Sequence, residues 1–175
     1  MSQNCVVKRV LGIDPGSRVT GYGIVEETQG KLVSIAFGAW QLSSKEFSER
    51  LKEIYYNIEQ LISEYKPTEV AIEALFFAKN AMSSIKLGQA RGAAMTAVAN
   101  QNLKVFEYSP AQVKQAVVGY GRADKEQVQK MVFLLLGLHG KAKVDATDAL
   151  AVAICHLNSV KFQQVSKFYD RLPAR

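Results

Sequence analysis

Residues 10–25, VLGIDPGSRVTGYGIV, contain two apolar runs separated by a tight turn. The first run ends on Asp14, and Pro15 and Gly16 follow at once, which is a turn signal. Because an isolated charge is expensive to remove from water, a carboxylate at the end of a buried strand needs a physical reason. Other acidic residues at equivalent places along the chain would supply that reason, because together with Asp14 they would form a site.

The composition is typical of one globular domain. The chain has 175 residues, of which 48% are hydrophobic and 22% are charged. Its start lacks signal-peptide character, and no apolar run approaches the roughly 18 residues of a membrane span. Two cysteines, Cys5 and Cys155, are too few for a disulfide framework or a Cys-based zinc site. We expect a cytoplasmic protein without membrane contact, with one domain over residues 1–160 and a flexible basic tail over residues 161–175.

Positive charge is concentrated in one segment. The formal net charge of the chain is +6, and residues 79–143 carry ten Lys and Arg against three Asp and Glu. Clustered positive charge in a folded domain favours a polyanionic partner, because phosphate contacts release counterions. A solvated basic face explains the same pattern, so composition leaves both interpretations open.

The first part of the chain predicts three antiparallel strands followed by a helix. The turn signals DPGS and TQGK separate strands over residues 6–14, 20–27 and 32–41. A capping box over residues 43–46 precedes apolar residues at helical spacing, which predicts a helix from Phe47 to Tyr65. The next apolar run ends on Glu73. Since a strand, a helix and a strand follow one another, this fourth strand runs parallel to one of the first three.

The second part of the chain alternates helices with one more strand. An Ala-rich stretch over residues 81–101 predicts a helix with a face of small residues, and LKVFEY predicts a fifth strand. Ser109 and Asp124 are N-cap residues for two further helices, and VDATDALAVAICHLN predicts a final one. This order indicates an α/β fold with a five-stranded mixed β-sheet and helices on both of its faces.

Four carboxylates occupy matching positions in this arrangement. Asp14 and Glu73 both end apolar strands, so they meet at one edge of the sheet if those strands are parallel neighbours. Asp145 and Asp148 are three residues apart and share one face of the final helix. A helix-capping role is an alternative for either of these two, because both lie near the start of the helix.

Four converging carboxylates repel one another unless a cation neutralises them. Oxygen ligands select a hard ion such as Mg²⁺ or Mn²⁺. Two such ions can activate a water molecule and stabilise the leaving oxygen in a phosphoryl displacement. An acidic metal centre beside a basic segment therefore predicts hydrolysis of phosphodiester bonds.

Five motifs, in order and over nearly the whole chain, carry a family resemblance: GIDPGSRVTGYG, AIEALFFAKN, KLGQARG, QVKQAVVGYGRADKEQV and DATDALAVAICH. They resemble the RuvC family of bacterial Holliday-junction resolvases, members of the ribonuclease H-like superfamily. The resemblance implies a ribonuclease H-like fold and a homodimer that makes paired, symmetric nicks in a four-way DNA junction, leaving 5′-phosphate and 3′-hydroxyl ends. It further implies cooperation with the RuvA and RuvB branch-migration proteins in recombination and DNA repair.

The resemblance also implies roles for individual residues. The family's metal-binding tetrad corresponds to Asp14, Glu73, Asp145 and Asp148, which we expect to hold two Mg²⁺ ions, with Mn²⁺ as a substitute. Lys114 and Lys125 match family lysines implicated in phosphate binding or transition-state stabilisation. Phe76 matches an aromatic residue that stacks on an unpaired base at the junction centre, although a core position is the alternative. Further candidate DNA contacts are Lys79, Lys86, Arg91 and Arg122.

Two other functions compete with a structure-specific nuclease. Actin-like ATPases also place an Asp and a glycine turn after their first strand, but they need two lobes, for which this chain is too short. A non-catalytic junction- or RNA-binding module would use the basic segment and leave the acids as helix caps. Such a module would hold junction DNA uncut in the presence of Mg²⁺.

Two further expectations concern packing. We expect dimerisation through the helix over residues 81–101, on its small residues Ala90, Ala94 and Ala97. We expect His139 and His156 to be surface side chains or satisfied, partly buried ones rather than metal ligands.

Overall fold

A five-stranded mixed sheet forms the centre of the protein. The computed structural model describes residues 7–74 and 81–169. The strands are β1 (Lys8–Asp14), β2 (Val19–Thr28), β3 (Lys31–Gln41), β4 (Glu69–Glu73) and β5 (Val105–Tyr108). Their order in the sheet is β3-β2-β1-β4-β5. The first three strands are antiparallel neighbours, whereas β4 runs parallel to both β1 and β5. The predicted mixed sheet is confirmed.

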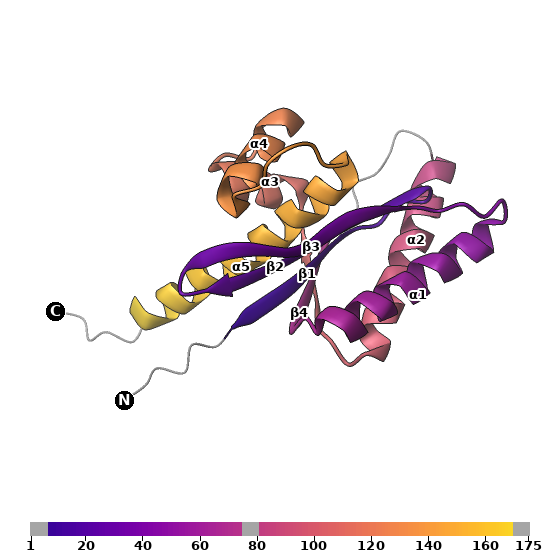
Figure 1. Ribbon diagram of the computed structural model, residues 1–175, viewed down its shortest axis with the longest axis horizontal. Coiled ribbons are helices and arrows are strands. Elements are labelled where there is room, and N and C mark those ends of the chain that lie inside the picture. Colours follow the sequence, from indigo (N-terminus) through magenta and orange to yellow (C-terminus); the bar gives the residue numbers. More distant parts are fainter. Residues whose placement is uncertain (1–6, 75–80, 170–175) are drawn as a thin grey trace.

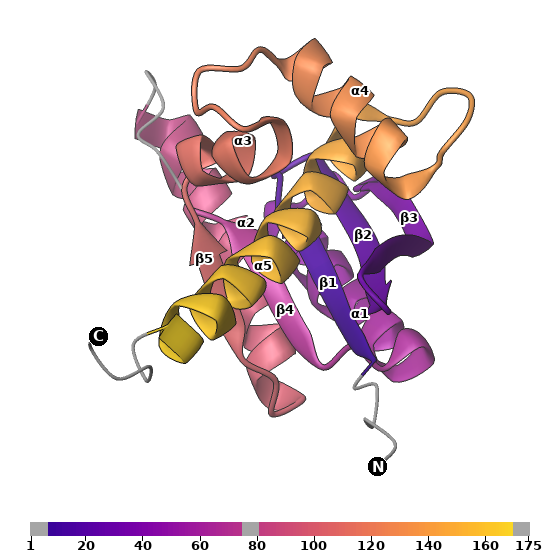
Figure 2. The same ribbon diagram turned by 90° about the vertical axis from the view of Figure 1, so that its left-hand side faces the viewer.

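Helices cover both faces of this sheet. They are α1 (Phe47–Tyr65), α2 (Ala81–Asn100), α3 (Pro110–Val118), α4 (Lys125–Leu136) and α5 (Val144–Tyr169). Helices α1 and α2 pack on one face, while α5 crosses the other face with α3 and α4 beside its N-terminal half (Figures 1 and 2). No helix in residues 7–74 and 81–169 is long and apolar enough to cross a membrane.

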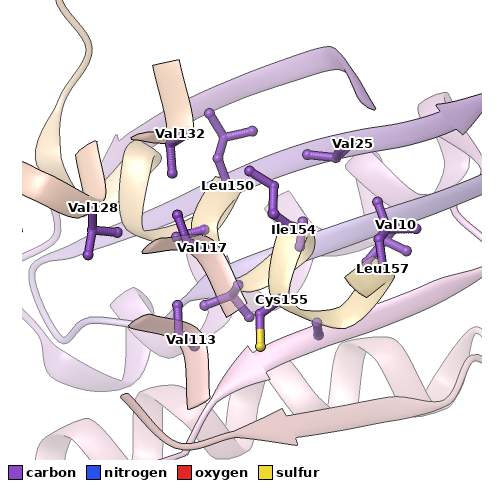
Figure 3. Close-up of a cluster of buried hydrophobic side chains, with 14 of the residues drawn as sticks. Val10, Val25, Val113, Val117, Val128, Val132, Leu150, Ile154, Cys155 and Leu157 are labelled. Atoms are coloured by element: carbon purple, nitrogen blue, oxygen red, sulfur yellow. The ribbon is translucent and has the colours of Figure 1, made fainter. Parts of the chain in front are cut away.

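Helix α5 is the centre of one of the two hydrophobic cores. Its side chains Leu150, Ile154 and Leu157 are buried in the cluster that contains Val10 and Val25 of the sheet. Valines of α3 and α4 cover the outer side of the helix (Figure 3). Because sheet and helices surround it, α5 is apolar on nearly all sides between residues 149 and 157.

Three glycines let α5 lie directly on the sheet. A Cβ atom at Gly12 would lie 2.0 Å from the carbonyl oxygen of Ala149, and one at Gly21 would lie 2.0 Å from that of Asp145. At Gly23 a Cβ atom would lie 2.8 Å from the side chain of Leu150. We call these three residues the glycine contact. Any larger residue there would push the backbone of α5 away from β1 and β2.

The caps of α3 and α4 match the sequence predictions, whereas the cap of α1 does not, although α1 begins at Phe47 as predicted. Ser109 and Asp124 cap α3 and α4, each in a complete capping box. The capping box predicted over residues 43–46 is wrong, because the N-cap of α1 is Glu46 and its side chain makes no cap hydrogen bond. Instead, the carboxylate of Glu53 accepts hydrogen bonds from the backbone N–H groups of Ser43 and Ser44.

The structure revises part of two other expectations, which concern the C-terminal residues and the small residues of α2. Helix α5 continues to Tyr169, so the tail predicted from residue 161 is helical as far as that residue. At the first residue of this segment, Nζ of Lys161 lies 2.9 Å from Oε1 of Glu27 on β2. The small residues of α2, which are Ala90, Ala94 and Ala97, are fully buried against the protomer's own core, so they are not available to a second subunit.

The glycine contact yields a stability prediction. We expect Gly12→Ala to destabilise the fold by about 3 kcal/mol, because the added methyl group must displace the backbone of α5. The matched control is Gly92→Ala on α2, where a Cβ atom meets open space. Ala should be more stable than Gly there by about 0.5–1 kcal/mol, because Gly loses more backbone entropy when the chain folds. Urea denaturation measures both, and equal stability of the two variants would contradict the close packing of α5.

Candidate active site

Two of the predicted acidic residues lie side by side at one edge of the sheet. Asp14 ends β1 and Glu73 ends β4, and these strands are parallel neighbours in which Ile13 is paired with Ile72. The turn after Asp14 is closed by Thr20, whose buried hydroxyl donates a 3.1 Å hydrogen bond to the carbonyl oxygen of Gly16. The predicted convergence of the two strand ends is therefore observed.

The glycine contact brings the other two acids to the same place. Gly21 is paired with Asp14 in the sheet, and the backbone of Asp145 lies directly over Gly21. The first turns of α5 consequently cover the end of β1. Asp145 and Asp148 both lie on these turns, so the four residues form one acidic cluster, made of Asp14, Glu73, Asp145 and Asp148.

The electrostatics of the cluster confirm that its members interact. Burial raises the pKa of Asp14 from its ordinary value of 3.8 to about 7, and the charges of Asp148, Glu73 and Asp145 add to this shift. Burial likewise raises the pKa of Glu73, with Asp148 as the next contributor. The pKa of Asp148 is also raised, mainly by burial. The cluster is therefore held together against its own charge repulsion.

Two lysines from α3 and α4 face the acidic cluster. The Nζ atom of Lys125 lies 3.5 Å from Oδ2 of Asp148, and its side chain is 76% exposed. The positive charges of Lys125 and Lys114 act to lower the pKa of Glu73. Both lysines line a cleft of about 260 Å³ together with Glu73 and Asp148. The cleft thus brings two cationic and two anionic side chains together.

The acidic cluster fits a hard divalent cation by its chemistry. Its donors are carboxylate oxygens, which are the ligands that Mg²⁺ and Mn²⁺ prefer. Burial, and after it the neighbouring carboxylates, raise the pKa values of Asp14, Glu73 and Asp148, and a bound cation would offset both effects. Among residues 7–74 and 81–169, no three His, Cys, Asp or Glu side chains are already arranged as a finished metal site.

Arg91 has a structural contact that the sequence did not indicate. Its Nε atom donates a 3.3 Å hydrogen bond to the backbone oxygen of Glu73, and its guanidinium forms an ion pair with Glu107. The side chain is only 14% exposed. The guanidinium of Arg91 thus holds the end of β4 in place. Its predicted contact with DNA stays a prediction.

The remaining predicted DNA contacts are distributed differently. Lys86 is exposed on α2, with its Nζ atom 5.8 Å from the ring centre of Phe47. Arg122 is exposed in the connection between α3 and α4. Phe76 and Lys79 lie outside the described residues.

A larger groove lies away from the acidic cluster. Its volume is about 870 Å³, and it runs between α3 and the second half of α5. The side chains that line it are Ala111, Gln112, Gln115, Ala116, Asn158, Ser159, Phe162 and Gln163. None of them is ionisable, so acid, base or metal chemistry belongs to the smaller cleft.

Comparison with known proteins decides the family. The sequence model described as "Crossover junction endodeoxyribonuclease RuvC" matches residues 10–156. The chain belongs to the RuvC family. The crossover junction endodeoxyribonuclease RuvC of Trichlorobacter lovleyi is 54% identical over 156 residues, which cover 89% of this chain and 88% of that protein. The RuvC of Geobacter sulfurreducens is 55% identical over 158 residues, covering 90% and 96% of the two chains.

Solved structures agree with this RuvC membership. The structure of T. thermophilus RuvC in complex with Holliday junction substrate superposes with a TM-score of 0.84 at 33% identity, and the match covers 89% of this chain and 96% of that one. The yeast mitochondrial Holliday junction resolvase Ydc2 matches with a TM-score of 0.69 at 13% identity, over 92% and 82% of the two chains, which shows a shared fold. The predicted α/β, ribonuclease H-like fold is confirmed.

The burial of Asp14 among other carboxylates predicts an unusual pH dependence of stability. The pKa of Asp14 is higher in the folded protein than in the unfolded chain, so this group favours folding below about pH 4, and the contribution is lost as the pH rises toward 7. In EDTA at about pH 8, Asp14→Asn should therefore raise the melting temperature by roughly 3–10 °C, or about 1–3 kcal/mol. The gain should disappear at about pH 4.

The control for this effect is Glu126→Gln on α4. The Glu126 side chain is 84% exposed and contacts Lys130 at 3.9 Å, so its neutralisation should leave the melting temperature unchanged at both pH values. Calorimetry of the metal-free proteins measures the effect. An Asp14→Asn variant that is less stable than the wild type at about pH 8 would contradict the crowding of charges.

Proposed function

We propose that this RuvC-family protein is a structure-specific endonuclease that resolves Holliday junctions. It hydrolyses phosphodiester bonds at symmetric positions and leaves 5′-phosphate and 3′-hydroxyl ends, in homologous recombination and DNA repair. The observation that carries this proposal is the half-buried acidic cluster at the sheet edge, with Lys114 and Lys125 facing it. A binding module would have no use for four carboxylates whose repulsion destabilises it.

The acidic cluster is the proposed metal site. Asp14, Glu73, Asp145 and Asp148 would hold Mg²⁺, with Mn²⁺ as a substitute and with two ions per site. A divalent cation there would activate the attacking water and stabilise the charge on the leaving oxygen. The strand ends supply two of the ligands and α5 supplies the others, so the rigid packing of α5 on the sheet fixes the ligand positions before the substrate arrives.

The two lysines would bind and stabilise the phosphate. Lys125 is exposed and extends from the start of α4 to within 3.5 Å of Asp148, so a phosphodiester at the acidic cluster would lie within its reach. Lys114 lines the same cleft from α3. A cation in this position favours the transition state, because negative charge accumulates on the phosphate oxygens during hydrolysis.

Junction DNA is the proposed partner. The fold similarity to T. thermophilus RuvC in complex with Holliday junction substrate supports this assignment. We propose backbone contacts for Lys86 and Arg122, which are both exposed, and, from the family resemblance alone, a contact for Lys79 and base stacking for Phe76. A contact for Arg91 is also proposed from the sequence, beside the contacts that its guanidinium makes within the protomer.

Symmetric nicks require two active sites, so we propose a homodimer. The exposed side of α2 is available for this contact, since Ile85 is 54% exposed whereas the small residues of that helix are buried. Cooperation with the RuvA and RuvB proteins and a cytoplasmic location, where chromosomal DNA is accessible, complete the proposal.

Incubation with a labelled synthetic four-way junction tests the function directly. We expect paired nicks in the presence of Mg²⁺, none in EDTA and none in a linear duplex of the same sequence. Asp14→Asn should reduce cutting at least about 100-fold, because it removes a proposed metal ligand, while junction binding in EDTA is retained because the basic surface is unchanged. Loss of binding in parallel with loss of cutting would contradict the role of the acidic cluster.

Two exposed lysines of α4 form a matched pair in the same assay. Lys125 contacts Asp148, whereas Lys130, which is 81% exposed, contacts Glu126. Lys125→Ala should slow cutting far more than Lys130→Ala does, although both remove one positive charge from one helix. Equal rates for the two variants would exclude a specific role for Lys125.

A further inference from the structure

A buried histidine on α5 is not used by the proposed chemistry. His156 lies two helical turns beyond Asp148 and is fully buried. Its Nε2 atom lies 2.9 Å from Oε2 of Glu69 on β4, and its Nδ1 atom lies 2.8 Å from Oη of Tyr108 on β5. Lys8 of β1 contacts the same oxygen of Glu69 at 2.8 Å. This His156 network, made of Lys8, Glu69, Tyr108 and His156, joins α5 to three strands.

The partners fix how protons are arranged in the network. Burial lowers the pKa of His156, so the ring is neutral. Burial acts to raise the pKa of Glu69, but hydrogen bonds from Lys8 and His156 outweigh it and leave the pKa lowered, so this carboxylate is ionised. The neutral ring therefore donates from Nε2 to Glu69 and accepts at Nδ1 from the hydroxyl of Tyr108. Both ring nitrogens are satisfied.

The network reaches both ends of the strand that carries Glu73. Glu69 is the first residue of β4, and Glu73 is the last. Tyr108 is the neighbour of Glu73 in the sheet, and its carbonyl oxygen accepts a 2.8 Å hydrogen bond from the N–H of Ala74. One side chain on α5 thus contacts the start of β4 and the residue beside its end.

The two ways in which α5 is attached to the sheet differ in kind. The glycine contact sets how closely α5 approaches β1 and β2, but apolar packing is not directional. The hydrogen bonds of His156 are directional, and they act on β4 and β5. Together with the ring of Phe106, whose centre is 4.4 Å from that of His156, they oppose sliding or rotation of α5 over those strands.

We propose that His156 is a positioning residue for the acidic cluster. Its two hydrogen bonds hold α5, and with it Asp148, in register with Glu73 on β4, and this register sets the affinity of the cluster for a divalent cation. The inference rests on the proposed function only in assigning a cation to the acidic cluster. His156 itself touches neither cation nor DNA.

His156→Phe tests this role, because a phenyl ring can pack beside Phe106 while both hydrogen bonds are lost. Titration calorimetry with Mn²⁺ alone, in the absence of DNA, should show an affinity reduced roughly 10- to 100-fold, as is typical when a group that orients metal ligands is removed. Cutting of the junction should need correspondingly more Mn²⁺, while junction affinity in EDTA stays unchanged. His156→Gln, which can still donate to Glu69, should restore part of the affinity.

Two further variants separate positioning from stability. Tyr108→Phe removes one hydroxyl and leaves the ring, so it folds even if His156→Phe does not, and it should weaken Mn²⁺ binding in the same direction by a smaller factor. Leu157→Ala removes a buried side chain beside His156 and should lower the melting temperature with Mn²⁺ affinity unchanged.

The outcomes distinguish the inference from the proposed function. Wild-type Mn²⁺ affinity in both His156→Phe and Tyr108→Phe would overturn the positioning role, as would a wild-type protein that binds no Mn²⁺. An equal loss of Mn²⁺ affinity in Leu157→Ala would also overturn it, because general destabilisation of the core would then explain the weaker binding. A further outcome is that the wild-type protein binds Mn²⁺, that His156→Phe weakens this binding, and that the wild type cuts no junction. This outcome would support the inference and overturn the proposed function alone.

Discussion

The close approach of α5 to the sheet is the constraint on which the rest of the structure depends. It requires glycine at three positions of β1 and β2, since a Cβ atom at Gly12 or Gly21 would lie 2.0 Å from a backbone oxygen of the helix. The approach allows α5 to be buried between the sheet and helices α3 and α4 (Figure 3). It also places the first turns of the helix over the end of β1, where the acidic cluster forms.

This arrangement stabilises the fold in one region and destabilises it in another. The apolar middle of α5 contributes much of one hydrophobic core, whereas its first turns force carboxylates together at the edge of the sheet. The pKa values of Asp14, Glu73 and Asp148 are raised there, mainly by burial and further by the neighbouring carboxylates. A site of this kind is ready to bind a divalent cation, because binding relieves a repulsion that folding has already imposed.

The sequence alone predicted the parts of the structure that depend on local pattern. Hydrophobic periodicity located the strands and helices, and the strand-ending positions of Asp14 and Glu73 indicated where they meet. Contacts between distant residues were not predictable in this way. Glu53 replaces the capping box at the start of α1, and the partners of His156 lie 48 and 87 residues away in the chain. Part of the glycine contact has a pattern in the sequence, because Gly21 and Gly23 are two residues apart and so lie on the same face of a strand. The pairing of Gly12 with Gly23 is visible only in the structure.

The location of a bound ion tests the central claim most directly. A crystal of the protein grown with Mn²⁺ would reveal the metal through its anomalous scattering. The account predicts a peak between the ends of β1 and β4 and the first turns of α5, with oxygen atoms of Asp14 and of at least one α5 carboxylate as ligands. Carboxylates of Asp14 and Asp148 that point apart, with no peak between them, would contradict it.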